Sequence, residues 1–239
     1  RVKIFADGAD IQKIRELSVL PWIKGLTTNP TLMRKSGVTD YSSFAKLVLG
    51  EVTDKPVSFE VFADDLPTME AQGRQIGGWA ANVNVKIPVT NTQGEFTGPV
   101  IGALSKAGIQ VNVTAVFTVE QVRAIASVLE PDVFAIVSLF AGRLADTGVD
   151  PIPVMTEAKA ALSQCPKAEL LWASPREVLN IIHAEQTGTD IITVTPDLLD
   201  KLSLFGKAPE QFSLETVRMF HGDADAAGYS IQLSAPIEA

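Results

Sequence analysis

The chain has 239 residues, 46% of them hydrophobic, and a formal net charge of -8. This acidic balance, without a basic run, argues against binding nucleic acid or an anionic membrane surface, and no apolar run reaches transmembrane length. The single cysteine, Cys165, excludes an intrachain disulfide framework and favours a reducing compartment, so we expect a cytoplasmic protein. We also expect a few residues to precede Arg1, because no initiator methionine or signal-like segment opens the sequence.

Short β-branched runs alternate with amphipathic stretches along the whole chain, and no Ser/Gly-rich linker divides it. The runs predict strands over residues 2–6, 24–27, 57–62, 82–87, 109–114, 133–140, 170–173 and 190–194. The stretches between them predict helices over residues 11–20, 41–52, 69–81, 119–129, 153–163, 175–185 and 196–204, and a terminal helix over about 213–228. We therefore expect one domain over residues 1–239.

Eight strands alternating with helices favour an α/β fold of the (β/α)8 TIM barrel type. A doubly wound open sheet has the same alternation and is the alternative, although the chain lacks the GxGxxG turn that often accompanies it. In a barrel the active site lies at the carboxyl ends of the strands.

Lys86 is a lone cation in the predicted fourth strand, within the run Val83-Asn84-Val85-Lys86-Ile87-Pro88. Burial at the inner end of such a strand favours the neutral amine, which can attack a carbonyl and start Schiff-base chemistry. The alternative is an ordinary exposed lysine on the outside of the sheet, which is the commoner situation.

Polar residues follow seven of the eight predicted strands, on a background of apolar strand residues. They are Asp7, Thr27 to Asn29, Glu60, Lys86, Asn112 with Thr114, Ser138 to Arg143, and Ser174 with Arg176. In a barrel these side chains converge on one pocket, which predicts an active site centred on Lys86.

Five segments in series resemble the transaldolase family: Gly25-Leu26-Thr27-Thr28-Asn29-Pro30-Thr31, Val85-Lys86-Ile87-Pro88, Asn112-Val113-Thr114, Ser138-Leu139-Phe140-Ala141-Gly142-Arg143 and Trp172-Ala173-Ser174-Pro175-Arg176. The resemblance covers nearly the whole chain. It implies a (β/α)8 barrel of the class I aldolase type that acts on sugar phosphates through a Schiff base, with no metal and no cofactor.

The resemblance implies that Lys86 attacks the ketose C2 carbonyl and that Asp7 handles the proton of the C4 hydroxyl. It also implies that Glu60 and Thr114 move protons through a water during carbinolamine formation and dehydration. The alternative for Asp7, which precedes Gly8, is a turn or cap residue, and the alternative for Glu60 is an outward-facing carboxylate.

The family's sugar-binding positions correspond to Thr27, Asn29, Asn112, Ser138 and Phe140. Their alternative is ordinary turn and cap chemistry. This applies above all to Asn29, which precedes Pro30, where an extended residue and a helix start are expected anyway.

The resemblance assigns the substrate phosphate to Arg143, Ser174 and Arg176, because guanidinium groups bind phosphate oxygens bidentately. We expect Ser174 at a helix start, where the positive helix end also favours an anion. The alternatives are a surface ion pair of Arg143 with Asp146 and a solvated helical position for Arg176 beside Glu177. The Arg143-Leu144-Ala145-Asp146 spacing departs from the usual family pattern in this loop.

The family contains transferases, which pass a three-carbon unit to an aldose phosphate, and aldolases that release the free ketone. Glu60 and Phe140 resemble the transferase branch, since the fructose-6-phosphate aldolase branch carries glutamine and tyrosine there. The rival from another class is a non-catalytic barrel that binds sugar phosphates.

The terminal helix is the expected site of self-association, because short members of the family pack it on a neighbouring subunit. A homo-oligomer is therefore one expectation, and a helix covering its own barrel is the other. His183 and His221 lack neighbouring ligands at metal spacing, so we expect no zinc site.

Overall fold

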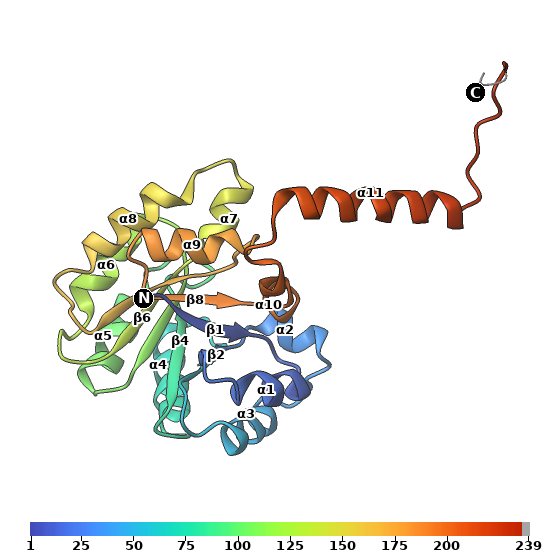
Figure 1. The fold of residues 1–239 in the computed structure, drawn as a ribbon. Coiled ribbons are helices and arrows are strands. Elements are labelled where there is room, and N and C mark those ends of the chain that lie inside the picture. Colours follow the sequence, from blue (N-terminus) through green and yellow to red (C-terminus); the bar gives the residue numbers. More distant parts are fainter. Residues whose placement is uncertain (236–239) are drawn as a thin grey trace. The chain divides into compact units, whose positions relative to one another are not determined.

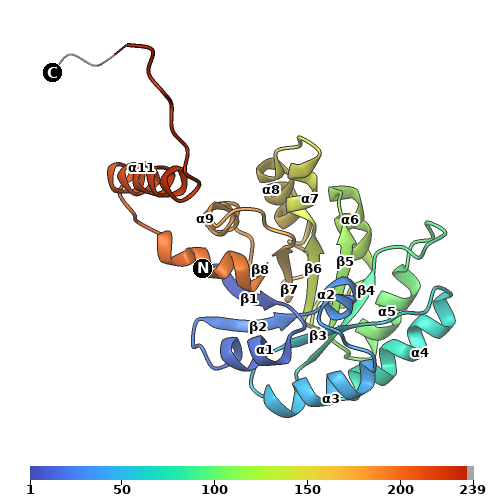
Figure 2. The ribbon, with the colours of Figure 1, turned by 90° about the vertical axis from the view of Figure 1, so that its right-hand side faces the viewer.

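The computed structural model describes residues 1–235, and contacts divide the chain into two compact units, Arg1–Asp200 and a second that begins at Lys201. In the first unit eight parallel strands form a closed barrel in chain order, with helices outside them (Figures 1 and 2). The predicted (β/α)8 barrel is confirmed, and the open doubly wound sheet is excluded. The single domain over residues 1–239 stays a prediction.

All eight predicted strands are present, with ends shifted by a few residues. Their bounds are β1 Lys3–Asp7, β2 Ile23–Thr27, β3 Val57–Glu60, β4 Val83–Pro88, β5 Val111–Val116, β6 Ala135–Leu139, β7 Ala168–Trp172 and β8 Ile191–Val194. The third strand ends earlier than predicted because the side-chain oxygen of Gln72 accepts the backbone N–H groups of Phe62 and Ala63, which leave the ladder.

The barrel helices are α1 Ile11–Ser18, α2 Pro30–Lys35, α3 Tyr41–Glu51, α4 Leu66–Gly77, α5 Gly98–Lys106, α6 Val119–Val128, α7 Ala141–Asp146, α8 Pro151–Ala161, α9 Leu179–Gln186 and α10 Pro196–Leu199. Aspartate side chains cap several of them: Asp10, Asp40 and Asp65 accept backbone N–H groups at the starts of α1, α3 and α4, each at 3.0 Å.

At α2 only a helix start after Asn29 was expected, without an end, and no helix was predicted at α5 or α7. The helices α2 and α7 have six residues each, which is too short for a clear apolar period. The helix α5 contains Gly98 and Gly102, which normally argue against a helix. Gly102 packs closely on α6, since a Cβ there would lie 3.3 Å from the backbone oxygen of Val128.

Strand alternation places Lys86 inside the barrel. Val85 points outward to α4, because a Cβ built on Gly73 of that helix would lie 3.5 Å from Val85 Cγ1. Its neighbours Asn84 and Lys86 therefore face the interior. Deeper in the interior, the ring of Phe5 crosses β2 so closely that a Cβ at Gly25 would lie 2.5 Å from it.

The second unit contains the helix α11, Pro209–Ala226. It starts four residues before the predicted start and ends two residues before the predicted end. The 3-10 helix η1, Asp200–Leu204, spans the boundary between the units. In α11, which lies wholly within the described residues, no residue is buried. Within residues 1–235, no helix is long and apolar enough to cross a membrane.

Candidate active site

Lys86 is buried at the carboxyl end of β4, with only 7% of its surface exposed. The strand register pairs it with Glu60 of β3 on one side and Asn112 of β5 on the other. Its Nζ donates a hydrogen bond to the backbone oxygen of Thr28 at 2.9 Å. The exposed-lysine alternative is therefore wrong, and the amine lies among polar groups inside the barrel mouth.

Two carboxyl groups, those of Asp7 and Glu60, interact electrostatically with Lys86. Burial raises the pKa of Asp7 above its ordinary value, while Lys86 and a hydrogen bond from Thr27 act in the lowering direction. Burial likewise raises the pKa of Glu60, again opposed by Lys86. Thr27 Oγ1 donates to Asp7 Oδ1 at 3.0 Å and also bonds the hydroxyl of Thr193. A carboxyl group whose pKa is raised takes up a proton more readily, which suits a residue that must accept and return protons.

Replacing Glu60 with glutamine is expected to stabilise the fold at neutral pH. Because the pKa of Glu60 is higher in the folded protein than in the unfolded chain, its favourable contribution is present at low pH and is lost as the pH rises through the folded-state pKa. The Glu60→Gln variant should therefore gain free energy of unfolding at pH 8, by about 0.5–2 kcal/mol.

This gain should shrink as the pH falls towards 4.5, the ordinary pKa of the carboxyl. Urea unfolding at pH 8 and pH 5 measures both values. The matched control is Glu157→Gln, on the exposed face of α8, which should change stability little at either pH. The expectation would be contradicted if the gain in free energy of unfolding of Glu60→Gln over the parent were smaller at pH 8 than at pH 5.

A buried hydrogen-bonded chain runs from β3 to β6 beside Lys86. Ser138 Oγ donates to Asn112 Oδ1 at 2.6 Å, and Asn112 Nδ2 donates to Ser58 Oγ at 3.1 Å. All three residues are nearly inaccessible to solvent. The sequence analysis missed Ser58, although its position two residues before Glu60 on the same strand places it on the same face.

Tyr41 is a second residue that the sequence analysis missed. Its hydroxyl accepts the backbone N–H of Glu60 at 2.7 Å and donates to the backbone oxygen of Glu60 at 3.0 Å. Burial raises the pKa of Tyr41 well above its ordinary value. Its ring packs against Phe59, Phe62 and Trp79. Tyr41 thus holds the end of β3, and no strand pattern could reveal it because it opens a helix.

Thr114 lies two residues before the end of β5, and Asn29 lies two residues after the end of β2. Thr114 is buried, and the ladder between β5 and β6 breaks just after it, where Ala115 takes a φ of 59°. This left-handed residue is strained backbone directly beside the predicted proton shuttle. Asn29 caps α2, since its Oδ1 accepts the Leu32 N–H at 2.8 Å. The cap alternative for Asn29 is therefore present, and it uses the carbonyl oxygen rather than the amide nitrogen.

Asn84 faces the barrel interior one layer below Lys86 and is inaccessible to solvent. Among the described residues, neither its amide nitrogen nor its carbonyl oxygen has a hydrogen-bond partner. Such a buried polar group costs stability, so the interior beneath the mouth is more polar than packing alone requires.

The predicted phosphate residues form a second group on the same end of the barrel. The backbone N–H of Arg143 donates to Ser174 Oγ at 3.2 Å, and the Arg143 guanidinium lies 5.8 Å from the centre of the Phe140 ring. A close backbone approach makes this possible, because a Cβ at Gly142 would lie 1.4 Å from the backbone oxygen of Ser174.

One expectation for this group is wrong, and so is one of the alternatives. Ser174 is not at a helix start, because α9 begins only at Leu179; the side chain of Asn180 accepts the N–H groups of Arg176 and Glu177 and holds an extra turn before the helix. The ion pair with Asp146 is made by Arg176 rather than by Arg143, at 2.5 Å.

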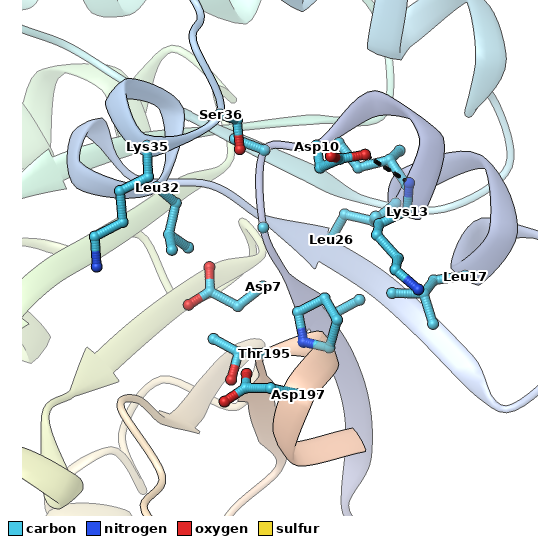
Figure 3. Close-up of a pocket in the computed structure, with 15 residues that line it drawn as sticks. Asp7, Asp10, Lys13, Leu17, Leu26, Leu32, Lys35, Ser36, Thr195 and Asp197 are labelled. Atoms are coloured by element: carbon cyan, nitrogen blue, oxygen red, sulfur yellow. Dashed lines mark hydrogen bonds between the residues drawn. The ribbon is translucent and has the colours of Figure 1, made fainter. Parts of the chain in front are cut away.

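A cavity of about 220 Å³ adjoins Asp7 on the side of α1, α2 and α10 (Figure 3). Its lining is largely apolar, with Leu17, Leu26 and Leu32, while Lys13 and Lys35 lie on opposite sides of Asp7. The sequence analysis did not predict this cavity, and of the predicted site residues only Asp7 lines it.

Comparison with solved structures supports the architecture. The chain resembles dihydrodipicolinate synthase from Rhodopseudomonas palustris with a TM-score of 0.55 and 12% identity, over 81% of this chain and 70% of that one. It resembles a putative orotidine-monophosphate decarboxylase from Toxoplasma gondii with the same TM-score and 13% identity, over 81% of this chain and 84% of that one. At such identities the likeness concerns the fold alone.

Comparison with sequences reaches further. A probable transaldolase of Methanococcus maripaludis is 35% identical over 206 residues, which are 84% of this chain and 89% of that protein. A probable transaldolase of Dehalococcoides mccartyi is 37% identical over 194 residues, 81% of this chain and 86% of that protein. The family model described as Transaldolase/Fructose-6-phosphate aldolase matches residues 4–233. The chain therefore belongs to the transaldolase/fructose-6-phosphate aldolase family.

Proposed function

We propose that this protein is a transaldolase that moves a dihydroxyacetone unit between sugar phosphates through a Schiff base on Lys86. The observation that carries the proposal is the buried position of Lys86 between Glu60 and Asn112, with Asp7 in the same electric field. The proposed donors are sedoheptulose 7-phosphate and fructose 6-phosphate. The proposed acceptors are erythrose 4-phosphate and glyceraldehyde 3-phosphate.

In the first step the neutral amine of Lys86 attacks the C2 carbonyl of the ketose and forms a carbinolamine. Glu60 and Thr114 move protons, through a water, to the hydroxyl that leaves as water. The product is an iminium, whose positive nitrogen can accept an electron pair. The raised pKa of Glu60 suits this work, because the group must gain and lose a proton in one cycle.

In the second step the Asp7 carboxylate takes the proton of the C4 hydroxyl. The C4 oxygen becomes a carbonyl, the C3–C4 bond breaks, and its electron pair moves into the iminium to give an enamine. The aldose phosphate leaves, and an acceptor aldose reverses these steps, with Asp7 returning the proton to the new hydroxyl. Thr27, Asn29, Asn112 and Ser138 are proposed to orient the sugar, with Phe140 at the mouth and Arg143, Ser174 and Arg176 on the phosphate.

The direct test traps the imine. The protein is incubated with fructose 6-phosphate and sodium borohydride, digested, and analysed by peptide mass spectrometry. We expect a reduced three-carbon or six-carbon adduct on the peptide that contains Lys86. If the adduct is absent or lies on another lysine, the proposed mechanism is wrong.

The second candidate is a lyase of the fructose-6-phosphate aldolase type, which releases free dihydroxyacetone. Glu60 and Phe140 favour the transferase, because the lyase branch carries glutamine and tyrosine at these positions. An assay without acceptor separates the two: steady accumulation of free dihydroxyacetone would favour the lyase. A third candidate, a non-catalytic sugar-phosphate binder, predicts binding with neither turnover nor adduct.

Self-association through α11 is part of the proposal. Phe212, Leu214, Val217, Met219 and Phe220 expose between 44% and 63% of their surface. An apolar surface of this kind usually meets a partner. Light scattering should therefore give a mass that is a multiple of the 25.6 kDa chain. Replacing Val217 and Phe220 together with aspartate should lower that mass, and a parent protein that is monomeric at working concentration would contradict the proposal.

A cytoplasmic location and a role in the pentose phosphate pathway complete the proposal. The family supports both, and the free, buried thiol of Cys165 supports the location alone.

A further inference from the structure

Both carboxylate oxygens of Asp146 accept hydrogen bonds from the guanidinium of Arg176. Arg176 Nε donates to Asp146 Oδ1 at 3.2 Å and Nη2 donates to Oδ2 at 2.5 Å. This parallel pair of bonds is the arrangement by which arginine also holds a phosphate. Asp146 therefore uses the edge of Arg176 that a substrate phosphate would need.

Asp146 also lies close to the other predicted phosphate residues. It is the last residue of α7, one turn after Arg143, whose backbone N–H binds Ser174. The hydrogen bonds from Arg176 hold the pKa of Asp146 below its ordinary value; burial opposes them, and the charges of Arg176 and then Arg143 lower the pKa further. One carboxylate thus lies in the field of both arginines, as a bound anion would.

We propose that Asp146 is an internal competitor for the phosphate-binding residues, which a phosphorylated ligand displaces from Arg176 and a neutral sugar does not. This inference rests on the proposed function for the role of Arg143 and Arg176. A phosphate monoester carries a charge of about -1.5 to -2 near pH 7, against -1 for a carboxylate, so it wins the exchange. Asp146 thereby makes the binding of a ligand at Arg176 depend on the charge of that ligand.

The exchange is feasible because the ion pair is solvated. The side chains of Arg176 and Asp146 are 47% and 54% exposed, and exposed pairs of this kind contribute little to stability. The pair can therefore open for a ligand without disturbing the barrel.

The test is Asp146→Asn, which keeps the shape of the side chain and removes its charge. Inorganic phosphate is titrated into the intact protein by calorimetry. We expect the variant to bind phosphate about three- to tenfold more tightly, through release of Arg176 and loss of repulsion. The matched control is Asp132→Asn, an exposed aspartate just before β6, at the opposite end of the barrel, which should leave the affinity unchanged.

A double-mutant cycle separates competition at Arg176 from a general change of surface charge. In an Arg176→Gln background, Asp146→Asn should tighten phosphate binding by less than about twofold. An equal gain in both backgrounds would overturn the proposal. Weaker phosphate binding by Asp146→Asn alone would also overturn it, because Asp146 would then position Arg176 for the anion. Unchanged binding would overturn it too, because Asp146 would then have no part in phosphate binding.

Turnover distinguishes this inference from the proposed function. If the enzyme is active, Asp146→Asn should lower KM for fructose 6-phosphate by a similar factor with little change in kcat. An active enzyme whose phosphate affinity and KM do not respond overturns the competitor and leaves the transaldolase proposal intact. A protein without turnover or Lys86 adduct, in which Asp146→Asn still tightens phosphate binding, supports the competitor while the transaldolase proposal fails.

Discussion

Replacing Lys86 with methionine is expected to lower kcat by at least about four orders of magnitude, because the variant has no amine to form the imine. The barrel should survive, since methionine fills much the same buried space and has no polar group to bury. A coupled assay with fructose 6-phosphate and erythrose 4-phosphate measures the loss. Borohydride trapping should then give no adduct on the corresponding peptide.

Lys86→Arg separates nucleophilicity from charge. Arginine keeps a cation beside Asp7 and Glu60, where Lys86 partly offsets the rise in pKa that burial causes, but its guanidinium does not deprotonate at working pH. This variant should be as inactive as Lys86→Met. The matched control is Lys24→Met, a strand lysine that points outward and should keep full activity. Turnover above a hundredth of the parent in either Lys86 variant would refute the nucleophile assignment.

Replacing Gly142 with alanine is expected to destabilise the barrel by about 3 kcal/mol or more, because the new Cβ would lie 1.4 Å from the backbone oxygen of Ser174. A backbone atom cannot rotate away as a side chain can, so α7 and the Ser174 loop must move apart. That movement would break the hydrogen bonds from Gly142 N–H to the Ala173 oxygen and from Arg143 N–H to Ser174 Oγ. Phosphate affinity should fall together with stability.

Gly50→Ala in α3 is the control for the Gly142 prediction. A Cβ at Gly50 meets nothing within 4 Å, and alanine is the better helix former, so stability should rise by about 0.5–1 kcal/mol. Urea unfolding compares the two variants directly. A Gly142→Ala variant as stable as the parent would show that α7 and the Ser174 loop do not need their close approach.

Most of what could be predicted about the site from the sequence follows from the alternation of side chains along the strands. The run around Lys86 alternates outward valines with inward polar residues, and the register brings Glu60, Lys86 and Asn112 side by side. Helix starts were predictable where a cap or proline marks them, as at Asp40 before α3. The start of α9 was not predictable in this way, because the Asn180 side chain binds the N–H groups of Arg176 and Glu177 and delays the helix.

Side-chain partners across the barrel could not be read from the chain. Ser58 bonds Asn112 over a separation of 54 residues, Tyr41 reaches Glu60 from a helix, and Arg176 rather than Arg143 holds Asp146. The sequence by itself determined the fold class, the approximate positions of the eight strands and the place of Lys86 at the end of the fourth, because these depend on local period and residue type. Only the tertiary structure decided which groups touch, because barrel closure brings together residues whose distance along the chain carries no signal.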